Sequence, residues 1–245
     1  MRRFFAPPEN FNDREIQLSL EESRHLRDVL RLHVGSTVAV FDGAGNEFVC
    51  LIETIGRRDE NARLRIVEKT EPPAAESKLD LTLAVALLKG EKFDLVIQKA
   101  VELGVTRIVP LVTIRADVRI KDEREGQKKL ERWQRIALEA AKQSGRAVVP
   151  EIKIPADFAD FLEHSSGKRM LFAERGGENL NQSLYKNEER LTAVVGAEGG
   201  WEDDEIIAAR ASGFTVVTLG GRILRAETAA ITFTALLQHL VGDLK

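Results

Sequence analysis

Two glycine-rich stretches near the C-terminus of the chain carry charged side chains of types that do chemistry. The first is Gly196–Gly200, with the sequence Gly-Ala-Glu-Gly-Gly, and the second is Leu219–Ile231, which holds two arginines, a glutamate and a threonine after two glycines. Carboxylates can accept a proton, and guanidinium groups can stabilise negative charge that develops during a reaction. Glycine allows a tight turn that other residues resist. These side chains are more polar than a simple connection between secondary-structure elements requires.

Each stretch follows a predicted strand and precedes a predicted helix. Leu191–Val195 and Phe214–Leu219 are apolar runs rich in valine and threonine, and helical patterns begin at Trp201 and at Ala226. In open α/β sheets, ligands bind beyond the carboxyl ends of the strands. Either loop alone is more typical of an ordinary turn, because glycine-rich turns are common. Since both loops carry an acid and both end a strand, we predict that together they form a ligand crevice.

The familiar nucleotide-binding and metal-binding motifs are missing from the sequence. There is no G-x-x-x-x-G-K-[ST] and no G-x-G-x-x-G, which excludes a P-loop and a dinucleotide fingerprint. The helix after the first loop begins with four acids, Glu202–Glu205, which suit the helix dipole but favour a ligand with cationic groups over one with several phosphates. The 4 histidines lack ligand spacing, so we predict no metal site. Cys50 is the only cysteine, so there is no intrachain disulfide.

The composition is that of a folded globular protein. The chain has 245 residues, 43% of them hydrophobic, and no apolar run approaches the ~20 residues that cross a bilayer. The N-terminus lacks the apolar core of a secretory signal, so we expect no membrane association and a cytoplasmic protein. The formal net charge is −3, yet residues 76–150 hold 15 Lys and Arg against 11 Asp and Glu. On charge alone, a solvated helix face explains this basic zone better than a footprint for a polyanion.

Residues 1–72 predict a small β-rich domain with one early helix. Ser19 and Glu22 have the spacing of a capping box, and the helix that they open carries Leu26, Val29 and Leu30 on one face. Short strands separated by turn residues are typical of a small barrel or sandwich. The predicted strands are Thr37–Phe41, Glu47–Ile55 and Arg63–Val67. Two adjacent prolines in Thr70–Ser77 break all periodicity, so this segment is predicted to link a domain of residues 1–72 to one of residues 73–245.

From Leu79 onward the pattern alternates between apolar strands and amphipathic helices. Such alternation is typical of an α/β fold with a mainly parallel sheet that helices cover on both faces. The predicted strands are Leu79–Leu88, Val105–Val112, Val148–Ile154, Lys168–Phe172, Leu191–Val195 and Phe214–Leu219. The predicted helices are Glu91–Leu103, Arg124–Ser144 and the two that follow the glycine-rich loops.

The two loops, read as Val195–Trp201 followed by Leu219–Ala229, resemble the paired signature of the 16S rRNA (uracil-N3) methyltransferases of the SPOUT superfamily. Further matching segments occur in the same order along almost the whole chain. They are Arg3–Phe5, His25–Leu26 with Val29–Arg31, Leu88–Lys92, Ile97–Ala100 with Glu102–Gly104, Arg132–Trp133 and Gln143–Ser144. One departure is Ala197, where the family usually has proline; it removes no functional group.

The resemblance implies a C-terminal parallel sheet threaded into a trefoil knot and a small N-terminal PUA-like β-barrel that binds RNA. It implies S-adenosylmethionine as methyl donor, 16S rRNA or the assembled small ribosomal subunit as substrate, and a homodimer with the pocket at its interface. Carried over residue by residue, the donor would be held by Leu171, Phe172, Gly196, Glu198, Gly199, Leu219, Gly221, Ile223, Leu224 and Thr228.

Methylation at N3 of uracil requires loss of the N3 proton, which leaves negative charge on the flanking carbonyl oxygens. Arg225, with Arg222 as second choice, is expected to stabilise that charge. Glu198 or Glu227 would accept the proton, although Glu227 is equally well explained as an acid that favours a helix N-terminus. The expected phosphate contacts are Arg2, Arg3, Arg27, Arg31, Lys89, Lys92, Arg115 and Arg119.

Two other functions remain open at the level of sequence. One is a non-catalytic ribosome-assembly factor that binds rRNA and keeps the fold only as a scaffold. The other is a SPOUT methyltransferase that acts on a ribose hydroxyl or a tRNA base. The intact glycine-rich loops and the Arg225–Glu227 pair favour an enzyme, and the barrel together with the run Arg222–Arg225 favours the rRNA base.

Overall fold

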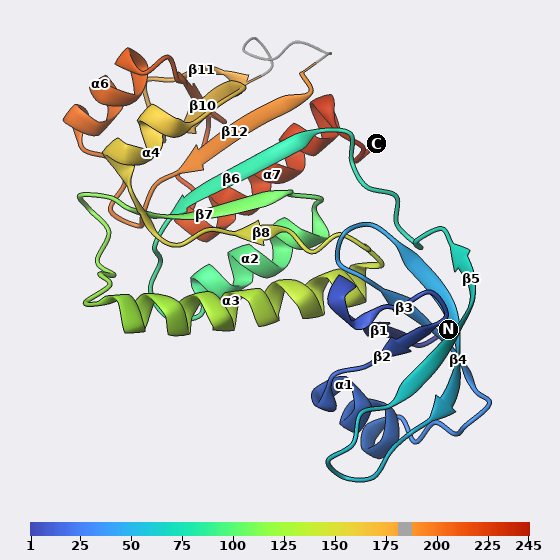
Figure 1. Cartoon of the computed structure of the whole chain (residues 1–245). Helices are drawn as coiled ribbons and strands as arrows, with labels where there is room; N and C mark the ends of the chain where they lie inside the picture. Colours follow the sequence, from blue (N-terminus) through green and yellow to red (C-terminus); the bar gives the residue numbers. More distant parts are fainter. Residues whose placement is uncertain (181–187) are drawn as a thin grey trace. The chain divides into compact units, whose positions relative to one another are not determined.

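The structure is a computed structural model that describes residues 1–180 and 188–245 (Figure 1). The chain folds into two compact units. The N-terminal unit comprises Met1–Glu76 and Ala141–Val149, and the C-terminal unit comprises Ser77–Ala140 and Pro150–Lys245. The domain boundary between residues 72 and 73 stays a prediction.

The N-terminal unit, all of whose residues are described, contains a five-stranded sheet that curls upon itself (Figure 1). The strand order is β1-β3-β4-β5-β2, with β1 and β3 parallel and the other pairs antiparallel. The strands are β1 (Arg3–Phe5), β2 (Glu15–Gln17), β3 (Thr37–Phe41), β4 (Glu47–Thr54) and β5 (Arg63–Thr70), and the short 3-10 helix η1 covers Pro8–Asn10. Alternate side chains, such as Val38, Val40 and Ile52, fill its core. The predicted β-rich domain is confirmed, although β1 and β2 were not predicted.

The early helix begins as predicted but then widens. In α1 (Leu20–Arg24) the Ser19 hydroxyl accepts a hydrogen bond from the Glu22 amide at 3.2 Å. A π-helical segment, η2 (His25–Val29), follows. The expected single apolar face is wrong, because Leu26 is buried whereas Val29 is 67% exposed. A π turn holds more residues than an α turn, so side chains three apart no longer lie on one face.

The segment Ala141–Val149 is tied into the N-terminal unit by ionic contacts. The Arg3 guanidinium bonds Glu47 at 2.7 Å and also donates to the main-chain carbonyls of Ala141 and Lys142. The Lys142 ammonium reaches Glu22 at 2.7 Å. Because these charges are largely buried and paired, removing one partner would leave the other uncompensated. The contacts make this segment part of the unit although it is distant in sequence.

The C-terminal unit is built on a parallel sheet. Among the described residues the strand order is β11-β13-β10-β12-β6-β7-β8, every pair is parallel, and β9 pairs with β7. The strands are β6 (Asp80–Ala86), β7 (Arg107–Val112), β8 (Glu151–Ile152), β9 (Ala156–Asp157), β10 (Lys168–Phe172), β11 (Glu178–Asn179), β12 (Arg190–Val195) and β13 (Thr215–Thr218). The predicted parallel sheet is confirmed, but the predicted strand Val148–Ile154 is reduced to β8.

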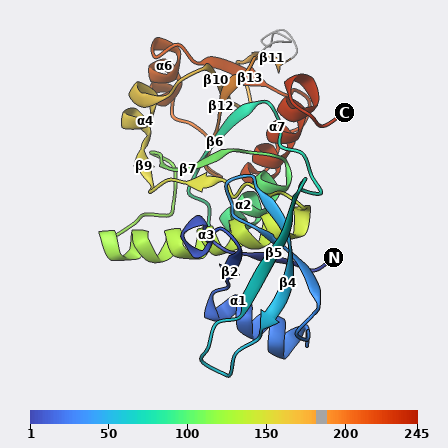
Figure 2. The same ribbon diagram turned by 45° about the vertical axis from the view of Figure 1, so that its right-hand side comes forward.

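Helices cover both faces of this sheet (Figure 2). Among the described residues they are α2 (Lys92–Glu102), α3 (Glu123–Ser144), α4 (Phe158–His164), α6 (Asp203–Ala211) and α7 (Ala226–Val241). Figure 2 shows α4 and α6 on one face and α2 and α7 on the other. Leu171 and Val194 pack with Phe158 in the core beneath α4 and α6. On the other face, Phe172 approaches Phe233 of α7 with ring centroids 6.0 Å apart. The strands of the sheet are therefore packed between two layers of helices.

Candidate functional site

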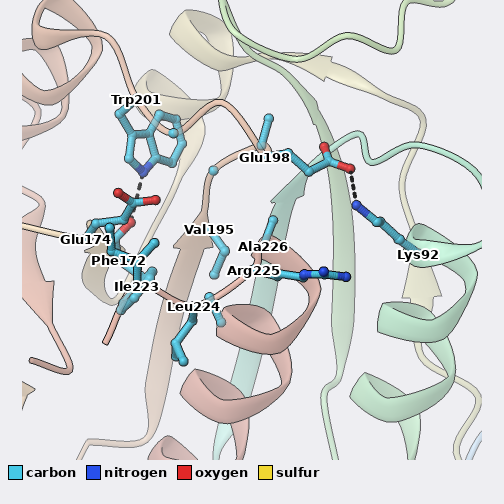
Figure 3. A pocket seen from close by; sticks show the side chains of 14 residues that line it. Lys92, Phe172, Glu174, Val195, Glu198, Trp201, Ile223, Leu224, Arg225 and Ala226 are labelled. Carbon is cyan, nitrogen blue, oxygen red and sulfur yellow. Dashed lines mark hydrogen bonds and ion pairs between the residues drawn. The ribbon is translucent and has the colours of Figure 1, made fainter. Parts of the chain in front are cut away.

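A cavity of about 330 Å³ lies at the carboxyl ends of β10 and β12, beside the N-terminus of α7 (Figure 3). The loops after β10, β12 and β13 all contribute to it, so the structure brings the two glycine-rich stretches together. Its lining residues are Lys92, Phe172, Glu174, Val195, Gly196, Ala197, Glu198, Gly200, Trp201, Ile223, Leu224, Arg225, Ala226 and Ala229.

The first loop is shaped around an indole ring. A Cβ on Gly196 would lie 2.9 Å from Cε2 of Trp201, closer than real Cβ contacts, so only glycine fits there. The Trp201 Nε1–H donates to the Phe172 carbonyl at 2.9 Å and thereby joins this loop to the end of β10. The Gly200 amide donates to the Ala197 carbonyl at 3.0 Å, with φ of Gly200 at +72°, a conformation that favours glycine. The wall of the cavity is therefore rigidly defined.

The second loop presents an arginine to the cavity. Gly220 and Gly221 both have positive φ, and they turn the chain after β13. Arg225 is the N-cap residue of α7, and its carbonyl accepts a hydrogen bond from the Ala229 amide at 2.8 Å. Its exposed side chain extends along the cavity (Figure 3). No described residue pairs with its guanidinium, which is thus available to a ligand.

Two carboxylates and one ammonium group lie close together at the cavity. The Lys92 ammonium donates to Glu198 at 2.9 Å and stands 4.0 Å from Oε2 of Glu227 (Figure 3 shows the first of these contacts). Glu198 also accepts a hydrogen bond from the Lys89 amide at 3.3 Å. Partial burial of Glu198 acts to raise the pKa of its carboxyl group, but the hydrogen bonds from Lys92 and from backbone amides outweigh it, so the net pKa is lowered. Glu198 is therefore held in its ionised form.

Glu227 has a different environment from Glu198. Its side chain is only 12% exposed, and its Oε2 is buried without a hydrogen-bond partner among the described residues. It lies in the first turn of α7, where the helix dipole favours a negative charge. A buried carboxylate oxygen that lacks a hydrogen-bond donor carries an energetic cost, which a donor on a ligand would relieve.

The cavity wall combines apolar surface with charges of both signs, the cations being Lys92 and Arg225. Phe172, Val195 and Leu224 supply apolar surface, while Glu174 and Glu198 place negative charge at the wall. The volume lies at the lower end of the range of small-molecule sites. Sequence reasoning missed Glu174; the signal for it is its position two residues after the predicted strand Lys168–Phe172, at the same sheet edge as the other loops.

The predicted donor-binding residues divide into two groups. Phe172, Gly196, Glu198, Ile223 and Leu224 line the cavity, and the remaining five, Leu171, Gly199, Leu219, Gly221 and Thr228, are not among its lining residues. Leu171 does not line the cavity because side chains alternate along β10, and Leu171 points into the core on the opposite face of the sheet from Phe172. A Cβ on Gly199 would lie 3.0 Å from the Cβ of Arg115, so that glycine accommodates a neighbouring segment.

The predicted catalytic residues are mostly gathered at one place. Arg225 and Glu198 line the cavity, and Glu227 is linked to it through Lys92. Arg222 is exposed and is not among the lining residues. The roles of all four remain predictions.

The predicted phosphate contacts in the C-terminal unit already have protein partners. Lys89 pairs with Asp117 at 2.8 Å, and Arg115 pairs with Glu202 at 2.8 Å. The Arg119 guanidinium donates to two main-chain carbonyls, and Lys92 belongs to the cavity. An RNA phosphate would have to share these cations with their present partners.

In the N-terminal unit, two of the predicted phosphate contacts have protein partners and the other two are exposed. Arg3 is only 12% exposed and is used in the contacts with Glu47 and the segment Ala141–Val149. Arg27 is held by Asp28 and donates to a main-chain carbonyl. Arg2 and Arg31 are exposed. RNA binding by these arginines stays a prediction.

The described residues were searched for a metal-binding cluster and for a membrane-spanning helix. Across residues 1–180 and 188–245, no group of three or more His, Cys, Asp or Glu side chains is arranged to hold a metal ion. In the same residues, no helix is both long and apolar enough to cross a membrane.

Comparisons with known proteins identify both parts of the chain. Residues 75–238 match the family model described as an RNA methyltransferase domain, and residues 19–64 match that described as an RNA methyltransferase PUA domain. A relative from Synechocystis, named ribosomal RNA small subunit methyltransferase E, is 35% identical over 98% of this chain and 78% of its own length. A relative of the same name from Mesomycoplasma hyopneumoniae is 40% identical over 64% of this chain and 68% of its own length.

Solved structures agree with the sequence comparisons. A putative methyltransferase from Legionella pneumophila, in complex with the cofactor SAM, superposes with a TM-score of 0.90 at 33% identity over 99% of this chain and 98% of its own. A ribosomal RNA small subunit methyltransferase E from Neisseria gonorrhoeae, bound to S-adenosyl methionine, has a TM-score of 0.90 at 32% identity and covers 100% of both chains.

Proposed function

The chain belongs to the RNA methyltransferase family, and from this membership we propose that it transfers a methyl group from S-adenosylmethionine to N3 of a uridine in 16S rRNA. Its relatives are named for methylation of small-subunit ribosomal RNA, and two similar structures hold S-adenosylmethionine. The choice of uracil N3 rests on the loop sequences and on the charged groups around the cavity.

The cavity has the chemistry that S-adenosylmethionine requires. Its apolar wall suits the adenine ring, and its acids suit the cationic amino and sulfonium groups of the methyl donor. When bound, the donor supplies an electrophilic methyl group on positively charged sulfur. The loops of the protein would orient that methyl group toward the opening where Arg225 lies.

The observation that carries the proposal is the guanidinium of Arg225, which lines the cavity and pairs with no described residue, together with the carboxylates Glu198 and Glu227 around Lys92. Uracil N3 bears a proton at neutral pH, and its removal leaves negative charge on O2 and O4. A preorganised guanidinium stabilises that charge without reorganisation during the reaction. The N3 lone pair then bonds to the methyl carbon while the carbon–sulfur bond breaks and its electron pair stays on sulfur.

We assign proton acceptance to Glu227 rather than to Glu198. Lys92 and the Lys89 amide hold Glu198 ionised, and a carboxylate with a lowered pKa is a weaker base. Glu227 has a buried Oε2 without a hydrogen-bond partner among the described residues, so protonation there costs no existing hydrogen bond. E227Q is therefore expected to lower turnover more than E198Q at neutral pH.

Product analysis tests the proposed function. Small-subunit rRNA from a strain that lacks the gene is incubated with the protein and S-adenosylmethionine, both as naked RNA and as assembled subunits, and its nucleosides are separated by mass spectrometry. We expect 3-methyluridine. A methylated ribose, another methylated base or no product would refute the choice of N3. R225A is expected to lower turnover by about 10²-fold with the donor affinity unchanged in calorimetry.

We propose further that the protein is a cytoplasmic homodimer with a knotted C-terminal unit, as the family resemblance implies. One face of α7 supports a self-association surface, because Ile231, Ala235 and Leu236 are only half-buried in the single chain. Ile223 lines the cavity and is 63% exposed, so a second copy that covers it would help to close the pocket. Light scattering of the purified protein tests the proposed homodimer, and a monomer at micromolar concentration would refute it.

A further inference from the structure

We propose that Lys92 is a second cationic group, in addition to Arg225, that stabilises the ionised uracil. The proposal rests on N3 methylation as the proposed function. A uracil that has lost its N3 proton carries negative charge on O2 and O4, which flank N3 on either side. One guanidinium placed at one carbonyl leaves the other without a cation. Two cations at one cavity match the two carbonyl oxygens.

Lys92 and Arg225 are both lining residues of the cavity, and they come from different elements. Lys92 is the first residue of α2, whereas Arg225 precedes the first residue of α7. Figure 3 shows the guanidinium of Arg225 pointing toward the side of the cavity where Lys92 lies. A uracil base that contacts both groups would meet a hydrogen-bond donor at each of its two carbonyl oxygens.

The position of Lys92 in its helix is not explained by helix stability. The N-terminus of a helix carries partial positive charge, so a lysine in the first turn is disfavoured there. Only Lys92 and Asp94 are charged in the first turn of α2, and Glu91 is the N-cap residue without a side-chain hydrogen bond. Glu198 and Glu227, which lie far along the chain, compensate for this cost.

The two carboxylates also hold the ammonium group ready for the reaction. Lys92 is hydrogen-bonded to Glu198 at 2.9 Å and lies 4.0 Å from Glu227, which is too long for a hydrogen bond. When the N3 proton passes to Glu227, negative charge moves from that carboxylate to the uracil ring. The local net charge is unchanged, and Lys92 exchanges its interaction with Glu227 for one with a uracil carbonyl.

K92M tests this role because methionine keeps an unbranched apolar stem and removes only the charge. We expect turnover at neutral pH, measured at saturating S-adenosylmethionine, to fall by about 10²-fold. K92R is expected to restore most of the lost turnover. The matched control is K99M, because Lys99 is also in α2 and pairs with Glu102 at 2.8 Å away from the lining residues of the cavity.

Two further measurements distinguish stabilisation of the ionised uracil by Lys92 from a structural role in which Lys92 only holds Glu198 and its loop in place. If Lys92 stabilises the ionised uracil, the loss of turnover in K92M becomes smaller as pH rises, because solvent hydroxide then removes the N3 proton. The deficit also shrinks on rRNA that contains 5-fluorouridine, since fluorine withdraws electrons and makes N3 more acidic. A purely structural defect would stay equal at every pH and on both RNAs.

The outcomes distinguish this proposal from the proposed function. If the wild-type protein forms 3-methyluridine and K92M matches it, or shows the same deficit at every pH and on both RNAs, the role of Lys92 is overturned and the proposed function stands. If the wild-type protein forms no 3-methyluridine, both are overturned. A deficit that shrinks with pH and with fluorination, with K99M unchanged, supports the proposal.

Discussion

Adding one methyl group at Gly196 should damage both the stability of the C-terminal unit and its affinity for the methyl donor. A Cβ at this position would lie 2.9 Å from Cε2 and 3.0 Å from Nε1 of Trp201. The indole ring cannot remain in place, and its hydrogen bond to the Phe172 carbonyl would be lost as it moves. Because Phe172 and Trp201 both line the cavity, the same shift displaces the cavity wall.

The expected loss can be estimated from three contributions. Overpacking a tight site costs about 1–3 kcal/mol, and a lost hydrogen bond costs about 1 kcal/mol more. The lower entropy of the unfolded chain offsets about 0.5–1 kcal/mol when glycine becomes alanine. We therefore expect G196A to lower the free energy of unfolding by about 1–3.5 kcal/mol. Each kcal/mol corresponds to a decrease in Tm of about 2–4 °C for a protein of this size.

Urea and thermal unfolding measure the change in stability, and calorimetry with S-adenosylmethionine measures affinity, which we expect to fall at least about tenfold. G126A is the matched control, because Gly126 lies in α3 and its added Cβ would make only an ordinary contact, 3.6 Å from the side chain of Ile120. Alanine is a better helix former than glycine, so this variant should be more stable by about 0.5–1 kcal/mol.

A double-mutant cycle tests the steric reasoning directly. Replacing Trp201 by leucine removes the ring that Gly196 accommodates, so G196A should cost at least about 1 kcal/mol less in the W201L background. Strict additivity of the two substitutions would refute the explanation. So would a G196A protein with wild-type stability and wild-type affinity for the methyl donor.

Other predictions concern buried charges and the single thiol. R3M should lower the free energy of unfolding in urea by about 3–5 kcal/mol, because Glu47 would remain buried without its partner; a loss below about 1 kcal/mol would contradict this. The lowered pKa of Glu198 stabilises the fold above the ordinary value of about 4.3, and this contribution disappears as pH falls through the lower folded-state pKa. The difference in unfolding free energy between wild type and E198Q should therefore shrink below about pH 4, and a constant difference would exclude the effect. Burial raises the pKa of the Cys50 thiol to about 12, so a thiol reagent at pH 8 should label it only in denaturant, whereas rapid labelling of the folded protein would be inconsistent with that burial.

Local patterns in the sequence were sufficient to predict most of the C-terminal fold. The strand Lys168–Phe172 and the helix that begins at Ala226 occur as predicted. The face of α2 predicted to be apolar, which includes Phe93 and Ile97, is buried. Periodicity and turn glycines are properties of short segments, so they can be recognised without knowledge of the fold. Prediction was less accurate where local geometry changes, as at Val29 within the π-helical segment.

The sequence by itself determined that two glycine-rich loops follow two successive strands of the chain and carry acids and arginines. Only the tertiary structure decided which of those groups meet. It joined Lys92 to Glu198, 106 positions apart, and attached Ala141–Val149 to the N-terminal unit through Arg3. Periodicity reports only which face of an element is apolar, whereas pairing between distant charges depends on how complete elements pack. Our proposal that Glu227 rather than Glu198 accepts the proton therefore depends on contacts in the folded chain.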